Sequence, residues 1–296
     1  MKTLMNLSTT MTEFGIEKAI ELHKKAGFDA YDFSFFPLVV IDWDKKAASP
    51  VKGHPLFADN YVEYAKKIRK YADELGIECR SSHAVFPTDV ADLRSYIKWC
   101  LEVTSILGGK ICVVHPGNNA SAEENAVFYK EFLPIAKEYG VKIACENMWN
   151  WNWEMAKLDK AYDHAVPAAC SHHDDFLKHL ELVDDEYLVA CLDIGHAEMK
   201  GLNTSSVEMI KTLGDKIAML HIHDNDKWHD NHAAPFTMDI DFVAICKALK
   251  DIGYKGDVTL EIDTNFGKNI SEDDALKILT NLANIAKKLK EMIINA

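Results

Sequence analysis

The chain has 296 residues, of which 48% are hydrophobic and only 8 are proline, so it can bury a sizeable core. Lys and Arg total 33 against 46 Asp and Glu, which gives a formal net charge of -13. This balance argues against non-specific nucleic-acid binding, which depends on neutralising phosphates. The chain has few groups for bidentate recognition of phosphate or guanine, because its only arginines are Arg69, Arg80 and Arg94.

The cysteines and the N-terminal residues indicate the cellular compartment of the protein. The seven cysteines are scattered, form no CxxC pair and mostly have apolar neighbours, which is typical of buried thiols in a reducing compartment. The first residues, Met-Lys-Thr-Leu-Met-Asn-Leu, lack the hydrophobic region of a signal peptide, and no apolar run approaches membrane-spanning length. We therefore expect a cytoplasmic protein without a membrane partner.

Short apolar strands alternate with longer helical stretches along the whole chain. Several strands are nearly continuous apolar runs, as in a parallel sheet buried on both faces. Eight strands, each followed by a helix, predict an α/β fold, a single (β/α)8 TIM barrel spanning residues 1–296. An open doubly wound sheet is the alternative, but no GxGxxG follows the first strand. The predicted strands are residues 2–7, 29–35, 77–85, 110–115, 141–147, 188–194, 216–222 and 257–263.

The ends of several helices are visible in the sequence. Three segments fit the capping-box pattern that begins a helix: Thr10-x-x-Glu13, Ser121-x-x-Glu124 and Ser205-x-x-Glu208. Four glycines fall just past helical stretches, where a left-handed residue often ends a helix: Gly27, Gly76, Gly140 and Gly253.

Two connections that follow strands are long, residues 36–58 and residues 148–170. In a TIM barrel both lie at the C-terminal face, where active sites are built. The second contains Trp149, Trp151 and Trp153, separated by asparagines. Because aromatic faces stack on sugar rings, Trp149 and Trp151 are candidates for a substrate wall, although packing of the loop onto the barrel is an equal alternative.

Polar residues end most of the predicted strands, at the face where barrel enzymes place their catalytic groups. A single histidine there is more often a structural residue than a ligand. A carboxylate after an apolar strand is different, because buried charge is costly unless it is paired or binds a metal. The residues at these ends are His83, His115, Glu146, Asp193 with His196, His221 with His223 and Asp224, and Glu261 with Asp263.

Three of these carboxylates indicate a metal site. Glu146, Asp193 and Glu261 each follow an apolar run, and no set of strand-end Lys or Arg is available to neutralise them. Beside His221 they would repel one another without a cation, so we expect these four residues to bind a divalent metal. Oxygen-rich ligation with one imidazole favours Mn²⁺, with Zn²⁺, Mg²⁺ or Co²⁺ as alternatives.

Residues 221–232 contain four histidines directly after a predicted strand. His221 is the member that we expect in the metal site with Glu146, Asp193 and Glu261, so its metal partners lie on other strands. His223 and His229 receive no role at this stage.

Four motifs, in this chain order, resemble the xylose-isomerase-like TIM barrels, a superfamily of sugar isomerases and epimerases, inositol-catabolism enzymes and endonuclease IV. The resemblance covers nearly the whole chain. The motifs are Cys145-Glu-Asn147, Leu192-Asp-Ile-Gly-His196, His221-Ile-His-Asp224 and Leu260-Glu261.

The resemblance implies a divalent-metal-dependent isomerase or epimerase that acts on a small-molecule carbohydrate, with a homo-oligomer possible. Glu146 and Glu261 would be the catalytic acid and base, moving a proton next to a carbonyl through an enediolate. Asp193 and His221 would complete the metal ligands. His196 would contact a substrate oxygen, and His115 would help to shape specificity.

The resemblance leaves other activities open. Ketose 3-epimerases carry an arginine after the strand-seven histidine, whereas residues 221–241 contain none, so a lyase or dehydratase acting on a keto-sugar or keto-inositol is a variant. A non-catalytic sugar-binding barrel becomes attractive only if Glu146 and Glu261 do not converge on one site.

The endonuclease IV branch is a further alternative, since it binds three zinc ions through additional ligands. The matching residues here are candidates for additional metal or substrate binding. The acidic charge and the lack of a basic loop that could enter a duplex disfavour a nuclease. These residues are His83, His115, His196, Asp230 and His232.

Overall fold

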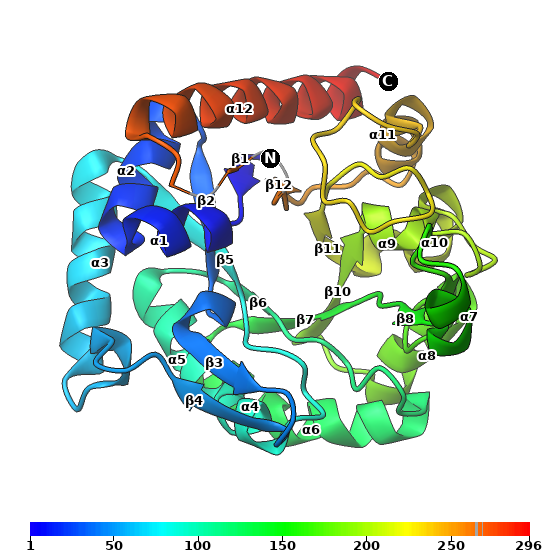
Figure 1. Cartoon of the computed structure of the whole chain (residues 1–296), viewed down its shortest axis with the longest axis horizontal. Helices are drawn as coiled ribbons and strands as arrows, with labels where there is room; N and C mark the ends of the chain where they lie inside the picture. The colour runs from blue at the N-terminus through cyan, green and yellow to red at the C-terminus, as the bar shows by residue number, and fades with distance from the viewer. Residues whose placement is uncertain (264–265, 268) are drawn as a thin grey trace.

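The computed structural model describes residues 1–263, 266–267 and 269–296. Within these residues, eight parallel strands surround the centre of the molecule, and helices lie outside them (Figure 1). Six strands pair in the order β2-β5-β6-β7-β10-β11, and β12 pairs with β1. Backbone bridges from Asn6 to Asp32 and from Ile222 to Leu260 join these two groups and close the ring. The strands are β1 (Thr3–Met5), β2 (Ala30–Ser34), β5 (Glu78–His83), β6 (Ile111–Val113), β7 (Lys142–Glu146), β10 (Leu188–Asp193), β11 (Ile217–His221) and β12 (Val258–Leu260).

The closed ring confirms the predicted TIM barrel over the open sheet. Each of the eight strands lies within the range predicted for it. The observed strands are shorter than the predicted ranges, although hydrogen bonds between neighbouring strands can continue beyond the assigned end of a strand. At β12, for example, three residues pair as a strand, and Glu261 beyond them still donates its N–H to the carbonyl of Ile222 at 3.1 Å.

Helices surround the strands, and most of their predicted ends are confirmed. The complete capping box at Ser121 begins α6, and Ser205 caps α10 through the N–H of Glu208. The prediction at Thr10 is wrong, because Thr10 lies inside α1, which begins at Ser8. The helices are α1 (Ser8–Phe14), α2 (Ile16–Ala26), α3 (Tyr61–Leu75), α4 (Ala91–Ser95), α5 (Ile97–Leu107), α6 (Ala122–Tyr139), α7 (Trp153–Leu158), α8 (His173–Val183), α9 (Ile194–Glu198), α10 (Ser206–Leu213), α11 (Phe242–Asp251) and α12 (Glu272–Asn295).

The apolar core has two main parts. The larger part packs between the strands and the helices. A smaller cluster fills the barrel interior and comprises Val113, Ala144, Val189, Cys191 and Met219. Because side chains alternate across a strand, the residue two positions after each interior residue also points into the barrel, one layer closer to the C-terminal face. This alternation is what directs the polar strand ends inward.

The two long connections that follow strands form small elements of their own at the C-terminal face. The first contains the antiparallel hairpin of β3 (Val39–Asp42) and β4 (Ala47–Pro50). The second contains β8 (Asn150–Trp151), α7 and β9 (Ala165–Val166). All seven cysteines lie within the described residues, and they are buried and free of disulfides. Within the described part of the chain, no helix combines the length and apolar character that a membrane crossing requires.

Candidate metal centre and active site

A cavity of about 450 Å³ opens at the C-terminal ends of the strands. Most of the residues predicted from the strand ends line it. Asp193 and His221 do not line it, and both are fully buried. The predicted residues on its lining are His83, His115, Glu146, Trp149, Trp151, His196, Asp230, His232 and Glu261.

Alternation along the strands explains this gathering. Glu146 follows interior Ala144 by two residues, and Asp193 follows Cys191 in the same way. His221 stands in the same relation to Met219. Each site residue is therefore the next inward-facing position beyond the apolar interior.

His221 joins the two predicted catalytic glutamates. Its Nδ1 lies 2.7 Å from Glu146 Oε1 and 3.3 Å from Glu261 Oε2. The other oxygen of Glu146, Oε2, lies 2.9 Å from His115 Nε2 and 3.4 Å from His83 Nε2. One carboxylate thus connects two groups of imidazoles, an arrangement that suits a metal-binding carboxylate.

Asp193 lies beside His221 in the parallel register of β10 and β11. Its Oδ1 accepts the backbone N–H of His196 at 2.7 Å and lies 3.1 Å from Nε2 of His223. Its Oδ2 is buried and has no hydrogen-bond partner among the described residues. The predicted ligand Asp193 is therefore adjacent to the site of Glu146 and Glu261, although its closest side-chain partners belong to a second group.

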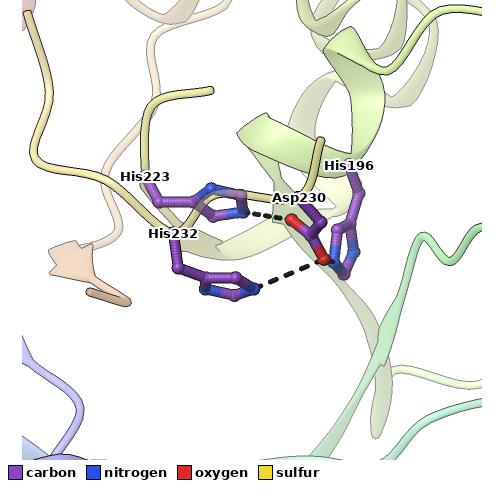
Figure 2. Close-up of side chains that lie close together, drawn as sticks. All are labelled: His196, His223, Asp230 and His232. Carbon is purple, nitrogen blue, oxygen red and sulfur yellow. Dashed lines mark ion pairs between the residues drawn. The ribbon is translucent and has the colours of Figure 1, made fainter. Parts of the chain in front are cut away.

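That second group is centred on Asp230 (Figure 2). Oδ2 of Asp230 lies 3.3 Å from His196 Nε2 and 3.5 Å from His232 Nε2. Its Oδ1 lies 3.6 Å from His223 Nε2. His223 received no role from the sequence, although it follows His221 by two residues and so faces inward by the same alternation.

The buried charges are strongly coupled. Burial would raise the pKa of Glu146, but the charge of His221 and hydrogen bonds from His115, His221 and His83 outweigh it and hold that pKa well below its usual range. Burial raises the pKa of Glu261, and nearby Glu146 adds to this. Around Asp230, burial would lower the pKa of His232, but the carboxylate raises it to about 10. The imidazoles beside Glu146 and Asp230 thus favour the charged form of each of these two carboxylates.

The tryptophan loop both packs on the barrel and faces the cavity. Trp149 is buried against Ala165, Met199 and Leu202, and its Nε1 donates to Asp230 Oδ2 at 3.2 Å. Trp151 is 43% exposed and lines the cavity. The sequence did not single out Trp43 and Phe86, which also line it.

The rest of the stretch 221–232 lies outside both groups. His229 Nδ1 lies 2.7 Å from Asp226 Oδ2, and its Nε2 lies 2.6 Å from the carbonyl oxygen of Ala161. These contacts hold the loop to the connection that follows β7. The four histidines of this stretch therefore divide into three site residues and one loop residue.

Comparisons with known proteins agree with this architecture. The family model of the xylose isomerase-like TIM barrel matches residues 20–285. The uncharacterized protein MJ1311 of Methanocaldococcus jannaschii is 28% identical over 250 residues, which cover 81% of this chain and 73% of that protein.

Two solved structures are similar in fold. A D-tagatose 3-epimerase-like protein has a TM-score of 0.67 at 23% identity, with 98% of this chain and 99% of that chain covered. D-Psicose 3-epimerase from Clostridium cellulolyticum H10 has a TM-score of 0.67 at 18% identity, with 100% of both chains covered. The chain belongs to the xylose isomerase-like TIM barrel family.

Proposed function

We propose that the protein is a divalent-metal-dependent isomerase or epimerase that moves a proton next to the carbonyl of a small carbohydrate. The convergence of Glu146 and Glu261 on one imidazole, at 2.7 and 3.3 Å from His221 Nδ1, carries this proposal. A non-catalytic sugar-binding barrel would not require two carboxylates at one point of the cavity. The solved structures with this fold include a D-tagatose 3-epimerase-like protein and a D-psicose 3-epimerase, which supports sugar chemistry.

The residues present fit a divalent cation. Two carboxylates meet at the imidazole of His221. Asp193 pairs with His221 in the strand register, and its Oδ2 is buried without a hydrogen-bond partner among the described residues. Glu146, Asp193, His221 and Glu261 would hold the ion, and this oxygen-rich set favours Mn²⁺ over Zn²⁺, Mg²⁺ or Co²⁺. When bound, such an ion supplies the positive charge that acidifies a C–H beside a carbonyl.

The chain's own residues would do the proton transfer. Glu146 and Glu261 reach the cavity from strands β7 and β12, so a sugar between them would present a different face to each carboxylate. One glutamate takes the proton and the other returns it, which inverts a carbon or relocates a carbonyl. Trp149 and Trp151 would stack on the sugar and exclude water from the reacting carbon.

Hydrogen exchange with solvent tests this function. Metal-loaded protein is incubated with a panel of ketoses and aldoses in D₂O, and NMR follows deuterium at the carbon next to the carbonyl. We expect exchange with at least one sugar, and a loss of about 10²–10⁴-fold in Glu146→Gln and in Glu261→Gln. Glu186→Gln is the matched control, since Glu186 is exposed before β10, at the opposite end of the barrel.

The products separate the variants of this chemistry. A recovered sugar with altered configuration or carbonyl position supports an epimerase or isomerase. Loss of water or cleavage of the carbon chain identifies a lyase or dehydratase acting through the same proton abstraction. If the whole panel shows neither exchange nor product with any of the four metals, the proposed function is wrong.

A further inference from the structure

The cavity extends beyond Glu146 and Glu261, and it does so on one side of the barrel. Its volume of about 450 Å³ lies in the range of about 300–1,000 Å³ that accommodates drug-sized ligands, so it has room for more than one sugar ring. Much of its lining comes from the segments that follow β2, β5, β6 and β7, whereas the described residues that follow β1 contribute nothing to it. The cavity therefore leads from the two glutamates toward the loops after β5 and β6.

A row of stacked rings connects the glutamates to the hairpin of β3 and β4. His115 Nε2 lies 2.9 Å from Glu146 Oε2, and the His115 ring stacks on Phe86 with centroids 4.6 Å apart. Phe86 also stacks on Phe36, with centroids 4.2 Å apart and an interplanar angle of 11°. Phe36 begins the 3-10 helix η1 (Phe36–Leu38), which leads directly into β3. This row therefore joins the catalytic end of the cavity to the base of the hairpin.

The hairpin of β3 and β4 places an exposed tryptophan on the cavity. Trp43 lies in the turn of the hairpin, lines the cavity and is 64% exposed. Its ring stacks on no other ring within the described part of the chain. The hairpin is held by its own ladder and by the N–H of Ala48, which donates to Asp92 Oδ2 on α4 at 3.0 Å. An aromatic face without a partner, fixed beside a polar cavity, suits stacking against a sugar ring.

Three asparagines on the lining supply hydrogen-bonding groups. They come from the segments that follow β6 and β7, and β5 and β6 lie between β2 and β7 in the ring (Figure 1). Asn118 Nδ2 donates to Asn150 Oδ1 at 3.4 Å, and Asn150 Nδ2 donates to Asn119 Oδ1 at 3.0 Å. These bonds orient the amides and leave Asn118 Oδ1 as an acceptor and Asn119 Nδ2 as a donor for the hydroxyl groups of a ligand.

Charge indicates the class of ligand that fits this part of the cavity. Apart from the strand-end glutamates and Asp230, Lys46 and Asp89 are the only Lys, Arg, Asp or Glu among the described lining residues, and their charges are opposite. A phosphate or carboxylate group on the ligand would meet no net positive charge here. A neutral ring with hydroxyl groups and one apolar face instead matches the tryptophan and the asparagines.

We propose that the cavity binds a two-ring carbohydrate. The sugar unit with the reacting carbonyl lies at Glu146 and Glu261, and a second, neutral sugar ring, joined to it by a glycosidic bond, lies against Trp43 and Asn119. This inference rests on the proposed function, because that function places the reacting carbon between the two glutamates. Binding of the second ring, away from the reacting carbon, would raise kcat/KM.

Paired substrates test for this second-ring subsite. Metal-loaded protein is assayed by hydrogen exchange in D₂O with the disaccharides lactulose, cellobiose and maltose, and with D-fructose and D-glucose, which carry the same reacting carbonyl groups. We expect kcat/KM for at least one disaccharide to exceed that of its matched monosaccharide by about tenfold or more, the effect of one well-stacked ring. Disaccharides that react no better than the monosaccharides would overturn the inference.

Trp43→Ala measures the contribution of stacking. The ratio of kcat/KM for the disaccharide to that for the monosaccharide should fall by about tenfold. Val40→Ala is the matched control and should keep the ratio, since Val40 lies on the same hairpin and is 57% exposed but does not line the cavity. Urea unfolding checks that both variants remain folded. If Trp43→Ala keeps the ratio, or Val40→Ala loses it equally, the subsite is wrong.

Asn119→Leu tests whether the second ring is a sugar. This substitution removes the donor and keeps a side chain of similar size at an exposed position. We expect the same ratio to fall by about 3–10-fold, the effect of one hydrogen bond. An unchanged or higher ratio would mean that the subsite takes an apolar group, and the assignment of a second sugar ring would be wrong.

Calorimetry with the same sugars separates the subsite from the proposed function. Disaccharide binding that weakens in Trp43→Ala, in a protein that exchanges no hydrogen, would support the subsite and contradict the isomerase or epimerase chemistry. Monosaccharide exchange together with disaccharide binding that Trp43→Ala leaves unchanged would support the chemistry and overturn the subsite.

Discussion

At the scale of single residues, His23 shows how burial alone can make stability depend on pH. This histidine lies on α2, its Nε2 is 3.1 Å from Thr10 Oγ1, and its ring stacks on Phe28. Its Nδ1 has no hydrogen-bond partner in the described part of the chain. Burial lowers the pKa of His23 from 6.5 to about 3, so the folded state keeps the imidazole neutral.

This shift predicts a loss of stability in mild acid. Between pH 6.5 and 3 the unfolded state binds the proton more readily than the folded state does. The contribution of His23 to the free energy of unfolding is therefore at its maximum above pH 6.5 and decreases as the pH falls. Between pH 7 and pH 5 wild type should lose about 2 kcal/mol more than His23→Gln, as measured by urea unfolding. At pH 7 and 8 the difference between the two proteins should be constant. Equal losses in both proteins down to pH 5 would contradict the role of His23.

The same scale shows which site residues a sequence can reveal. Glu146 and Glu261 could be predicted because the charge of a carboxylate that follows a buried strand must be balanced by a cation or a positively charged side chain. The structure brings both carboxylates to His221. His223 could not be assigned, although the alternation of β11 points it inward. Its place depends on the missing side chain at Gly195, which lies on another element and whose contact with His223 is not visible in the sequence.

At the scale of elements, the strands could be predicted because several of them are nearly continuous apolar runs that alternate with helical stretches, while the details of the loops could not. Apolar runs and terminal glycines mark strands and helix ends locally. The hairpin of β3 and β4 and the path of residues 222–241 depend on contacts between distant residues. Asp224 is an example, since its carboxylate accepts backbone N–H groups from Thr237, Met238 and Ile240 at 3.0, 2.9 and 3.1 Å.

Asp224 should therefore fix the loop that carries Asp230 and His232. It is fully buried, so Asp224→Asn would place amide hydrogens against backbone N–H groups that have no access to water. We expect the free energy of unfolding to fall by about 2–4 kcal/mol, and amide exchange of Thr237, Met238 and Ile240 to accelerate.

Asp241→Asn is the matched control for that loss. Asp241 is exposed and caps α11 through the N–H groups of Val243 and Ala244, both at 3.1 Å. Asparagine caps helices about as well as aspartate, so this variant should lose only about a few tenths of a kcal/mol. Similar losses in the two variants would show that buried carboxylate charge does not organise the loop.

At the scale of the whole molecule, the net charge favours the proposed sugar substrate over a nucleic acid. The structure gathers the additional residues that the endonuclease IV resemblance implies, so the ligands alone do not exclude a nuclease. The net charge of -13 opposes a polyanion. Each arginine is also occupied by an acidic partner: Arg69 by Asp73, Arg80 by Asp257 and Arg94 by Glu131.

The cavity also has few basic side chains, which predicts weak binding of DNA. Among the described residues that line the cavity, Lys46 is the only lysine or arginine. A duplex would therefore release few counterions on binding, and its affinity should be weaker than about 100 µM at physiological salt. Fluorescence anisotropy with a labelled duplex that contains one abasic site measures this, with zinc-loaded protein and a known AP endonuclease as the positive control. Salt-sensitive binding at micromolar concentration, with strand incision that disappears in Glu146→Gln, would instead assign the centre to phosphodiester chemistry.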